Sequence, residues 1–273
     1  MLHRLLGVAA LAVLSPSVGA VPMLGLEGFS HRGTWVDDRQ AMTIGRRVWE
    51  NASGGTLQGL THWGYGEEFA SLGIGHFIWY PETTNKPFQE SFPGLLSYME
   101  ERGTVLPDWL KGSPPCPWPD RETFLRERDS PRMQELREFL RATIHLQARF
   151  MADRLEAALP RVLNASPERW RDLVRGRFEA LAPQPHGLYA LMDYVNFKGE
   201  GIGRHERYGG KGWGLLQALL FMRGRPEGPQ ALQEFSRATR RVLTRRIKHS
   251  PPERGESRWM PGWTKRITTY ASA

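Results

Sequence analysis

The chain of 273 residues contains one cysteine, Cys116, and this scarcity excludes several classes of protein. A single thiol cannot form an intrachain disulfide, and it cannot build a zinc ribbon or an iron–sulfur centre, which need several thiolates. The eight histidines show no metal-ligand spacing, and the His-Glu-x-x-His motif is absent. A Walker-type phosphate loop and a Gly-x-Ser-x-Gly nucleophile elbow are also missing. Because the single cysteine and the histidines lack metal-ligand patterns, we expect no metal site.

Acidic residues are in the minority, with 29 Asp and Glu against 37 Lys and Arg, and the formal net charge is +8. A basic chain favours an anionic partner, such as nucleic acid, a membrane surface or a cell-wall polymer. Outside the N-terminus, no apolar run approaches the ~20 residues that are needed to cross a bilayer. The mature protein is therefore expected to have no transmembrane segment.

The first twenty residues have the pattern of a secretory signal peptide. Arg4 provides a positive charge, Leu5–Leu14 is a short apolar run, and residues 18–20 are Val-Gly-Ala. Small residues at the first and third of these positions match a signal-peptidase site, and the run is too short for a membrane anchor. The pattern predicts cleavage after Ala20 and a periplasmic or secreted protein of residues 21–273. Export argues against nucleic acid as the partner.

Helical spacing of apolar residues dominates the mature chain. It predicts helices at about residues 37–51, 93–103, 131–155, 167–178, 188–197, 213–222 and 229–248. Asp37 or Asp38 can cap the first of these, and Ser130 and Ser166, each followed by proline, are expected to cap the helices that begin after them. Between the first two, residues 57–80 mix frequent glycines with aromatic and β-branched residues, which is typical of a small hairpin or meander. The predicted fold class is α+β and predominantly α-helical, in a single domain of residues 21–273. A hairpin lobe at about 57–80 is expected beside a helical lobe at about 120–250.

Two groups of carboxylates could carry chemistry. Glu50 is expected at the C-terminal end of the first helix, where Trp49 and the helix dipole would raise its pKa, as a general acid requires. Seventeen residues later stand Glu67 and Glu68. Two carboxylates that face each other across a groove are the arrangement for glycoside cleavage. Because side chains alternate along a strand, Glu67 and Ser71 share a face and Glu68 points the other way, unless a bulge inverts the order.

A resemblance to a known family rests on two motifs. Residues 71–76, Ser-Leu-Gly-Ile-Gly-His, resemble the Thr-x-Gly-x-Gly-His hairpin of phage-type lysozymes, with serine in place of threonine. In that family a catalytic Glu ends the preceding helix and a second carboxylate enters the hairpin, and Glu50, Glu67 and Ser71 stand in that order. Residues 191–201, followed by Gly-Trp-Gly-Leu-Leu-Gln at 212–217, are similar to the Asp-x-x-x-Asn-x-Gly and Leu-Gln helices of peptidoglycan-cleaving relatives. The gap between the carboxylates resembles that of chitosanases in the same superfamily.

The resemblance implies an exported bacterial member of the lysozyme-like superfamily that cleaves β-1,4-linked amino-sugar glycan, above all peptidoglycan. Glu50 would protonate the leaving oxygen, and Glu67, helped by Ser71, would activate a water molecule for hydrolysis. In a lytic transglycosylase, Glu50 would act alone and a hydroxyl of the substrate would attack. Neither scheme needs a cofactor. The alternative is a non-catalytic glycan-binding or cell-envelope scaffold protein.

The same motifs suggest residues that bind the glycan. Gly73 and Gly75 would let the backbone approach a sugar ring, and His76 would orient the hairpin. Trp79 offers a flat aromatic face, and Asn196 could donate a hydrogen bond to an N-acetyl or hydroxyl group. Each has an ordinary structural alternative, namely turn geometry for the glycines, core packing for the tryptophan and local capping for the asparagine.

Overall fold

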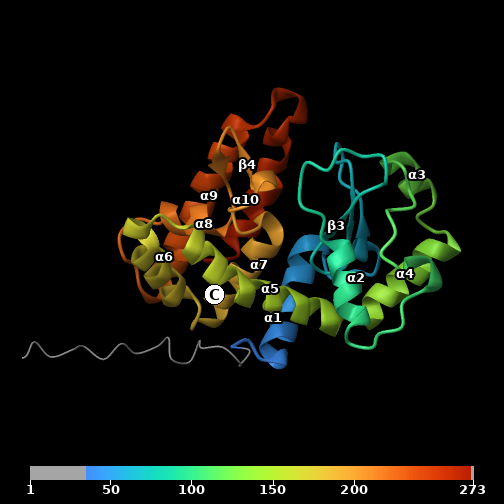
Figure 1. The fold of residues 1–273 in the computed structure, drawn as a ribbon, viewed down its shortest axis with the longest axis horizontal. Coiled ribbons are helices and arrows are strands. Elements are labelled where there is room, and N and C mark those ends of the chain that lie inside the picture. The colour runs from blue at the N-terminus through green and yellow to red at the C-terminus, as the bar shows by residue number, and fades with distance from the viewer. Residues whose placement is uncertain (1–34, 272–273) are drawn as a thin grey trace, which may run out of the picture. The chain divides into compact units, whose positions relative to one another are not determined.

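The structure is a computed structural model that describes residues 35–271. The part of the chain that starts at Val36 forms one compact unit, whereas the expected signal peptide, residues 1–20, lies outside the described residues. The helices are α1 (Asp38–Ser53), α2 (Phe92–Glu100), α3 (Arg121–Arg126), α4 (Pro131–Ala142), α5 (Ile144–Ala165), α6 (Glu168–Leu181), α7 (Pro185–Lys198), α8 (Leu215–Phe221), α9 (Gly228–His249) and α10 (Met260–Thr268) (Figure 1).

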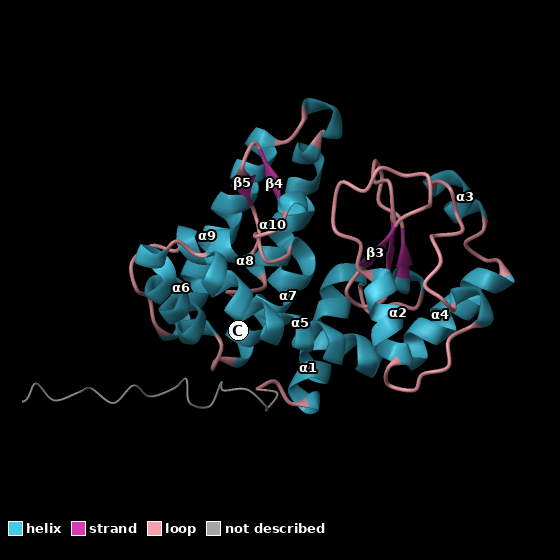
Figure 2. Ribbon diagram, viewed as in Figure 1, coloured by secondary structure: helices cyan, strands magenta, loops and turns pink. Residues whose placement is uncertain are grey.

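Five short strands form two small sheets (Figure 2). They are β1 (Thr61–His62), β2 (Ala70–Leu72), β3 (Phe77–Trp79), β4 (Arg207–Tyr208) and β5 (Lys211–Gly212). The first three pair in the order β1-β2-β3 and the last two pair with each other, all antiparallel. The expected α+β class with a predominance of helix is therefore confirmed. Helix α10 and the β4–β5 hairpin were not expected from the sequence.

The start of α1 follows from its sequence. The side chain of Asp37 accepts a hydrogen bond from the backbone of Gln40 (2.7 Å), and the side chain of Gln40 accepts one from the backbone of Asp37 (3.1 Å). This capping box satisfies two backbone N–H groups at the helix terminus. Helix α4 begins as expected too, because the Ser130 hydroxyl accepts from the backbone of Met133 (3.3 Å).

Two details of the later helices differ from expectation. The long helix expected over 131–155 is divided at Thr143 into α4 and α5. The Ser166 hydroxyl donates to the carbonyl of Val162 (2.7 Å), so it closes α5 and does not cap α6. A serine hydroxyl can serve either neighbouring helix, and the sequence motif alone does not decide which.

Two groups of elements lie on either side of α5. The sheet lobe, residues 57–142, carries β1–β3 and α2–α4, and the helical lobe, residues 166–271, carries α6–α10 and β4–β5. Helix α5 packs against α2 of the sheet lobe, against α6 and α7 of the helical lobe, and against α1. None of the helices within residues 35–271 is both long and apolar enough to cross a bilayer.

A buried ion pair fixes α10 to α7. Asp193 is fully buried and accepts hydrogen bonds from Arg266 (2.9 and 2.6 Å) and from the Tyr270 hydroxyl (2.6 Å). A second buried pair joins Arg246 of α9 to Glu256, which begins the 3-10 turn before α10 (2.7 and 2.6 Å). Both pairs are satisfied by hydrogen bonds, as buried charges require. They place the tryptophans and arginines of residues 258–266 beside the sheet lobe.

Candidate active site

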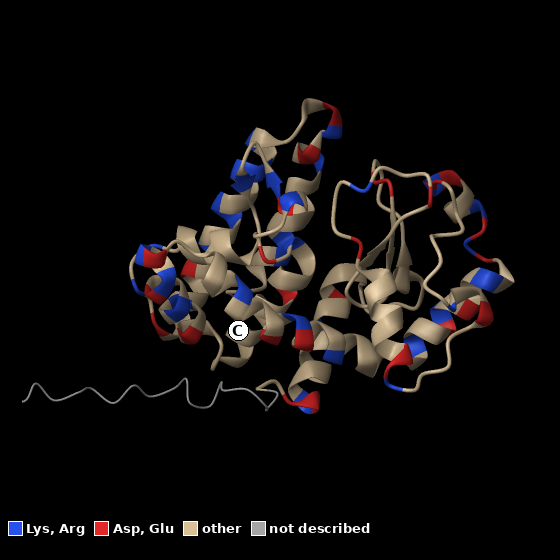
Figure 3. Ribbon diagram, in the orientation of Figure 1, with Lys and Arg blue, Asp and Glu red and all other residues tan. Residues whose placement is uncertain are grey.

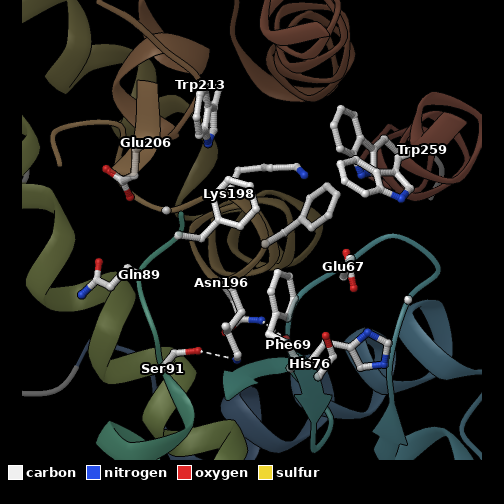
Figure 4. Close-up of a pocket in the computed structure, with 18 of the residues that line it drawn as sticks. Glu67, Phe69, His76, Gln89, Ser91, Asn196, Lys198, Glu206, Trp213 and Trp259 are labelled. Carbon is white, nitrogen blue, oxygen red and sulfur yellow. Dashed lines mark hydrogen bonds between the residues drawn. The ribbon is translucent and has the colours of Figure 1, made fainter. Parts of the chain in front are cut away.

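A pocket of about 520 Å³ lies between the two lobes (Figure 4). Its sheet-side wall comes from residues 62–91: His62, Gly64, Tyr65, Glu67, Phe69, Ser71, Gly75, His76, Ile78, Phe88, Gln89 and Ser91. Its helix-side wall comes from residues 196–266: Asn196, Phe197, Lys198, Gly199, His205, Glu206, Trp213, Arg246, Arg258, Trp259, Trp263 and Arg266. Arg154 of α5 also lines the pocket. In the sequence it falls between the segments that form the two walls.

The alternation expected around Glu67 is present. Glu67, Phe69 and Ser71 line the pocket, and Glu68 does not. The side chain of Glu68 is 50% exposed and pairs with Arg254 at 3.6 Å. The β1–β2 and β2–β3 registers set His62 and Ile78 beside Ser71 on the same face of the sheet.

The Glu67 carboxyl is partly buried, and this burial raises its pKa. A hydrogen bond from Gly64 and the positive charges of Lys198, Arg254 and Arg246 oppose that rise. A Cβ added at Gly64 would lie 2.4 Å from Glu67 Oε2, so a glycine is needed for the carboxyl to lie there. The backbone is held by the Trp63 indole, which donates to the Glu67 carbonyl at 2.8 Å. A carboxyl that keeps its proton nearer neutrality is suited to general acid catalysis.

His76 lines the pocket in an uncharged state. Its ring stacks on that of His62 with centroids 5.5 Å apart, and burial lowers the pKa of His76 to about 3. Its φ of 51° is in the left-handed region, and its Nε2 atom has no hydrogen-bond partner among the described residues. At neutral pH, His76 can exchange a hydrogen bond with a ligand but cannot supply the acidic proton.

Asn196 joins the two walls. Its side-chain amide donates to the carbonyl of Gly75 (2.6 Å), and its oxygen accepts from Arg154 (3.3 Å). Asn196 therefore holds the end of α7 to the turn between β2 and β3. It lines the pocket, and its predicted contact with substrate stays a prediction.

Three residues expected in the site are not among the lining residues. Glu50 is exposed: α1 buries Val48 against α5, and Glu50 lies two residues later, about 200° around the helix. Trp79 follows Ile78 on the strand, so it faces the core, where its indole donates to the Pro114 carbonyl (2.9 Å) and its ring lies 4.9 Å from that of Phe92. For Trp79, core packing replaces the expected stacking on a sugar.

Gly73 shapes the turn between β2 and β3 and does not line the pocket. Its φ is +69°, and an added Cβ would lie 2.3 Å from the side-chain oxygen of Gln147. That oxygen accepts a hydrogen bond from the backbone of Ile74 (2.8 Å), which fixes the turn to α5. Gly75 does line the pocket, as expected of a backbone that approaches a ligand.

The helix-side wall contains functional groups that sequence reasoning missed. Four of its residues are cations, namely Lys198, Arg246, Arg258 and Arg266, and three are tryptophans, namely Trp213, Trp259 and Trp263. Lys and Arg also gather on α9 and beside β4 and β5 (Figure 3). Of these residues, Lys198 and Trp213 stand within the quoted motifs, whereas residues 246–266 carry no motif that marks them.

Two contacts join the two lobes beside the pocket. Arg258 donates to the carbonyl of Gly66 (3.3 Å), and an added Cβ at Gly66 would lie 2.1 Å from that guanidinium. The Arg254–Glu68 pair makes the second contact. Both join the segment before α10 to the loop between β1 and β2.

Within residues 35–271, no group of three or more His, Cys, Asp or Glu side chains is arranged to hold a metal ion. In comparisons with known proteins, no family model, no curated protein and no solved structure matches this chain.

Proposed function

We propose that the protein cleaves an amino-sugar glycan of the peptidoglycan type and that Glu67 is the acid that protonates the glycosidic oxygen. One observation carries the proposal: a pocket of about 520 Å³ holds a partly buried carboxyl opposite a wall of tryptophans. Flat aromatic faces suit sugar rings, and a carboxyl with a raised pKa suits a general acid.

Glu206 is the other carboxylate that lines the pocket, and it is engaged in hydrogen bonds with the backbone. Glu206 accepts hydrogen bonds from the backbone N–H groups of Glu200 (2.8 Å), Ile202 (2.8 Å) and Gly203 (2.9 Å). These bonds tie it to the loop after α7, so it is poorly placed to activate water. With Glu50 outside the pocket as well, Glu67 is the carboxyl that is free to transfer a proton there.

A single carboxyl favours the lytic scheme over the two-carboxylate scheme. Glu67 gives its proton to the leaving oxygen as the glycosidic bond breaks. The resulting carboxylate takes a proton from a hydroxyl of the same sugar, and that hydroxyl oxygen bonds to the anomeric carbon. Glu67 ends protonated as it began, and the product is an anhydro sugar.

Charge favours peptidoglycan over chitosan. On the helix-side wall, Arg246 and Arg266 are paired with Glu256 and Asp193, and Lys198 and Arg258 remain as cations without an ion pair among the described residues. Chitosan is a polycation and would be repelled by such a wall, whereas peptidoglycan carries carboxylates.

The test is digestion of isolated peptidoglycan by the purified protein, with mass spectrometry of the released fragments. Glu67→Gln should reduce the rate by about 10²–10⁴-fold, the usual contribution of a general acid or base. Glu68→Gln is the matched control, because Glu68 is the adjacent carboxylate and does not line the pocket. Fragments that lack one water molecule relative to hydrolysis products support the lytic scheme.

The same assay can overturn the assignment. If Glu50→Gln is inactive and Glu67→Gln retains activity, the acid is Glu50. If the wild type releases nothing yet sediments with peptidoglycan, the protein binds glycan without cleaving it. Hydrolysis products with an added water would show that water is the nucleophile.

A further inference from the structure

The amino group of Lys198 is a charged group without a counter-charge in contact. The residue ends α7, lines the pocket and is 8% exposed. Among the described residues, no hydrogen bond or ion pair is formed by its Nζ atom. An amino group that lines a pocket and has no partner in the protein can bind a ligand group of opposite charge.

Two aromatic rings hold the Lys198 side chain in place. Its Nζ atom lies 3.8 Å from the ring centroid of Phe197 and 3.7 Å from that of Trp263. The side chain extends across the helix-side wall toward the part of the pocket where Trp259 lies (Figure 4). Aromatic faces position a cation but leave its hydrogen-bond donors free for a ligand.

The neighbouring cations already have partners. Arg246 of α9 is paired with Glu256 (2.6 Å), and Arg266 of α10 is paired with Asp193 (2.6 Å). Glu67, on the sheet-side wall, is the remaining charged group that acts on Lys198. Of the four cations of the helix-side wall, Lys198 and Arg258 form no ion pair among the described residues, and Lys198 is the one of these two that also forms no hydrogen bond.

We propose that Lys198 binds a carboxylate of the glycan, so that the pocket selects acidic saccharides over neutral ones. This inference rests on the proposed function, because it takes the ligand to be a glycan, and it adds the substrate class. An ammonium–carboxylate hydrogen bond inside a pocket is stronger than one between neutral groups. The same geometry offers no advantage to a neutral sugar.

The carboxylate has two sources in peptidoglycan. It can be the lactyl group of a muramic acid that carries no peptide, or a free carboxylate of the short peptide attached to that group. Both present the same chemistry to Lys198, and ligands that carry one or the other distinguish them.

Binding should also be coupled to proton uptake. Burial, and next the charge of Arg246, lower the pKa of the Lys198 amino group well below its ordinary value. Arg266 acts in the same direction, whereas the negative charges of Glu256 and Glu67 oppose it. A bound carboxylate favours the charged amine, so binding raises the pKa of the Lys198 amino group from its lowered value in the free protein.

The first experiment measures the affinity of three disaccharides: N-acetylglucosaminyl-N-acetylmuramic acid, its dipeptide derivative and neutral chitobiose. We expect the wild type to bind at least one acidic ligand about ten-fold more tightly than chitobiose. Lys198→Met should abolish this preference and leave the affinity for chitobiose unchanged. Lys211→Met removes an exposed lysine on β5 outside the pocket and should keep the preference.

The second experiment needs no variant and so does not depend on how Lys198→Met folds. Calorimetric titrations of the wild type, in buffers with different ionisation enthalpies and at a series of pH values, count the protons taken up. We expect proton uptake with an acidic ligand at pH values between the pKa of the free amine and that of the complex, and none with chitobiose.

Equal affinity for all three disaccharides, or a preference that survives in Lys198→Met, would overturn the inference even if peptidoglycan is cleaved. Acidic ligands bound without proton uptake would overturn the coupling. Conversely, the carboxylate preference together with no cleavage of peptidoglycan would leave Lys198 as the carboxylate site and refute the enzymatic proposal.

Discussion

The two walls of the pocket differ in charge and in construction. The sheet-side wall comes from one continuous segment, residues 62–91, and carries the Glu67 carboxyl beside an uncharged His76. The helix-side wall is assembled from α7, the β4–β5 region, α9 and α10, and it carries four cations. The proposed proton donor and the proposed anion-binding group therefore belong to different lobes, so each can be altered without the other.

The walls are also stabilised differently. Turns with left-handed backbone, at Gly73 and His76, shape the sheet-side wall. Buried ion pairs, Asp193–Arg266 and Arg246–Glu256, hold the helix-side wall. Substitutions that disturb one kind of support at a time test this difference.

The largest effect on stability is expected on the helix-side wall. Asp193→Asn keeps the shape of the side chain but leaves Arg266 buried without its counter-charge. Loss of one partner of a buried pair costs about 3–5 kcal/mol, and we expect that loss in the free energy of unfolding measured with urea. Asp108→Asn removes one partner of an exposed pair with Lys111 and should leave the unfolding curve unchanged. Equal curves for the two variants would show that the buried pair does not support this wall.

On the sheet-side wall, Gly73→Ala should lower the free energy of unfolding by about 2 kcal/mol. Alanine is strained in the left-handed backbone at this position, and its Cβ would displace the side-chain amide of Gln147. Gly94→Ala is the matched control. Gly94 lies in α2, where an added Cβ would make only an ordinary contact at 3.9 Å with Phe150. Thermal unfolding of both variants measures the difference, and an unchanged midpoint for Gly73→Ala would contradict the assigned role of the turn.

The uncharged state of His76 predicts a dependence of stability on pH. Its pKa is about 3 in the folded protein against an ordinary value of 6.5, so the unfolded chain binds a proton that the folded protein does not. The stabilisation is complete above 6.5 and is lost as the pH falls toward 3. Between about pH 6 and 4 we expect the wild type to lose about 1–3 kcal/mol more than His76→Asn, which tolerates the left-handed backbone. Parallel pH profiles would refute this account.

The smallest change in stability is expected for a substitution of Glu67. Its raised pKa means that the ionised form is disfavoured in the folded protein, so stability is complete below 4.5 and falls as the pH rises through the raised value. We expect Glu67→Gln to be more stable than the wild type at pH 7 and equally stable at about pH 4. Denaturant titrations at the two pH values measure this, and a less stable variant at neutral pH would mean that the charge supports the fold.

Local features were predictable because they depend on neighbours in sequence. The Asp37 cap and the Ser130 cap follow from hydrogen bonding within a few residues, and Glu68 points away from the pocket as predicted although it precedes β2. Trp79 was misplaced because an aromatic side chain in a hairpin suits a sugar and a core equally well. Only its contacts with Pro114 and Phe92 show that the side chain packs in the core.

The helix-side wall could not be predicted because its residues are distant in sequence and carry no shared pattern. Lys198 and Trp263 are 65 residues apart, and their contact depends on the packing of α10 against the rest of the lobe. The position of Glu50 was difficult to predict for the same reason. The helix spacing was correct, but the direction of its exposed face depends on where α5 packs.

The contacts between Arg258 and Gly66, and between Arg254 and Glu68, have a consequence for how a polymer enters. Together with α5 they close a loop of protein around the pocket. The free end of a strand can thread through such a loop, whereas the middle of a strand can enter only after the loop opens. Partly exposed charge contacts contribute about 0–1 kcal/mol each and weaken with salt. Ionic strength should therefore change the rate of attack on the interior of a strand more than the rate of attack at its ends.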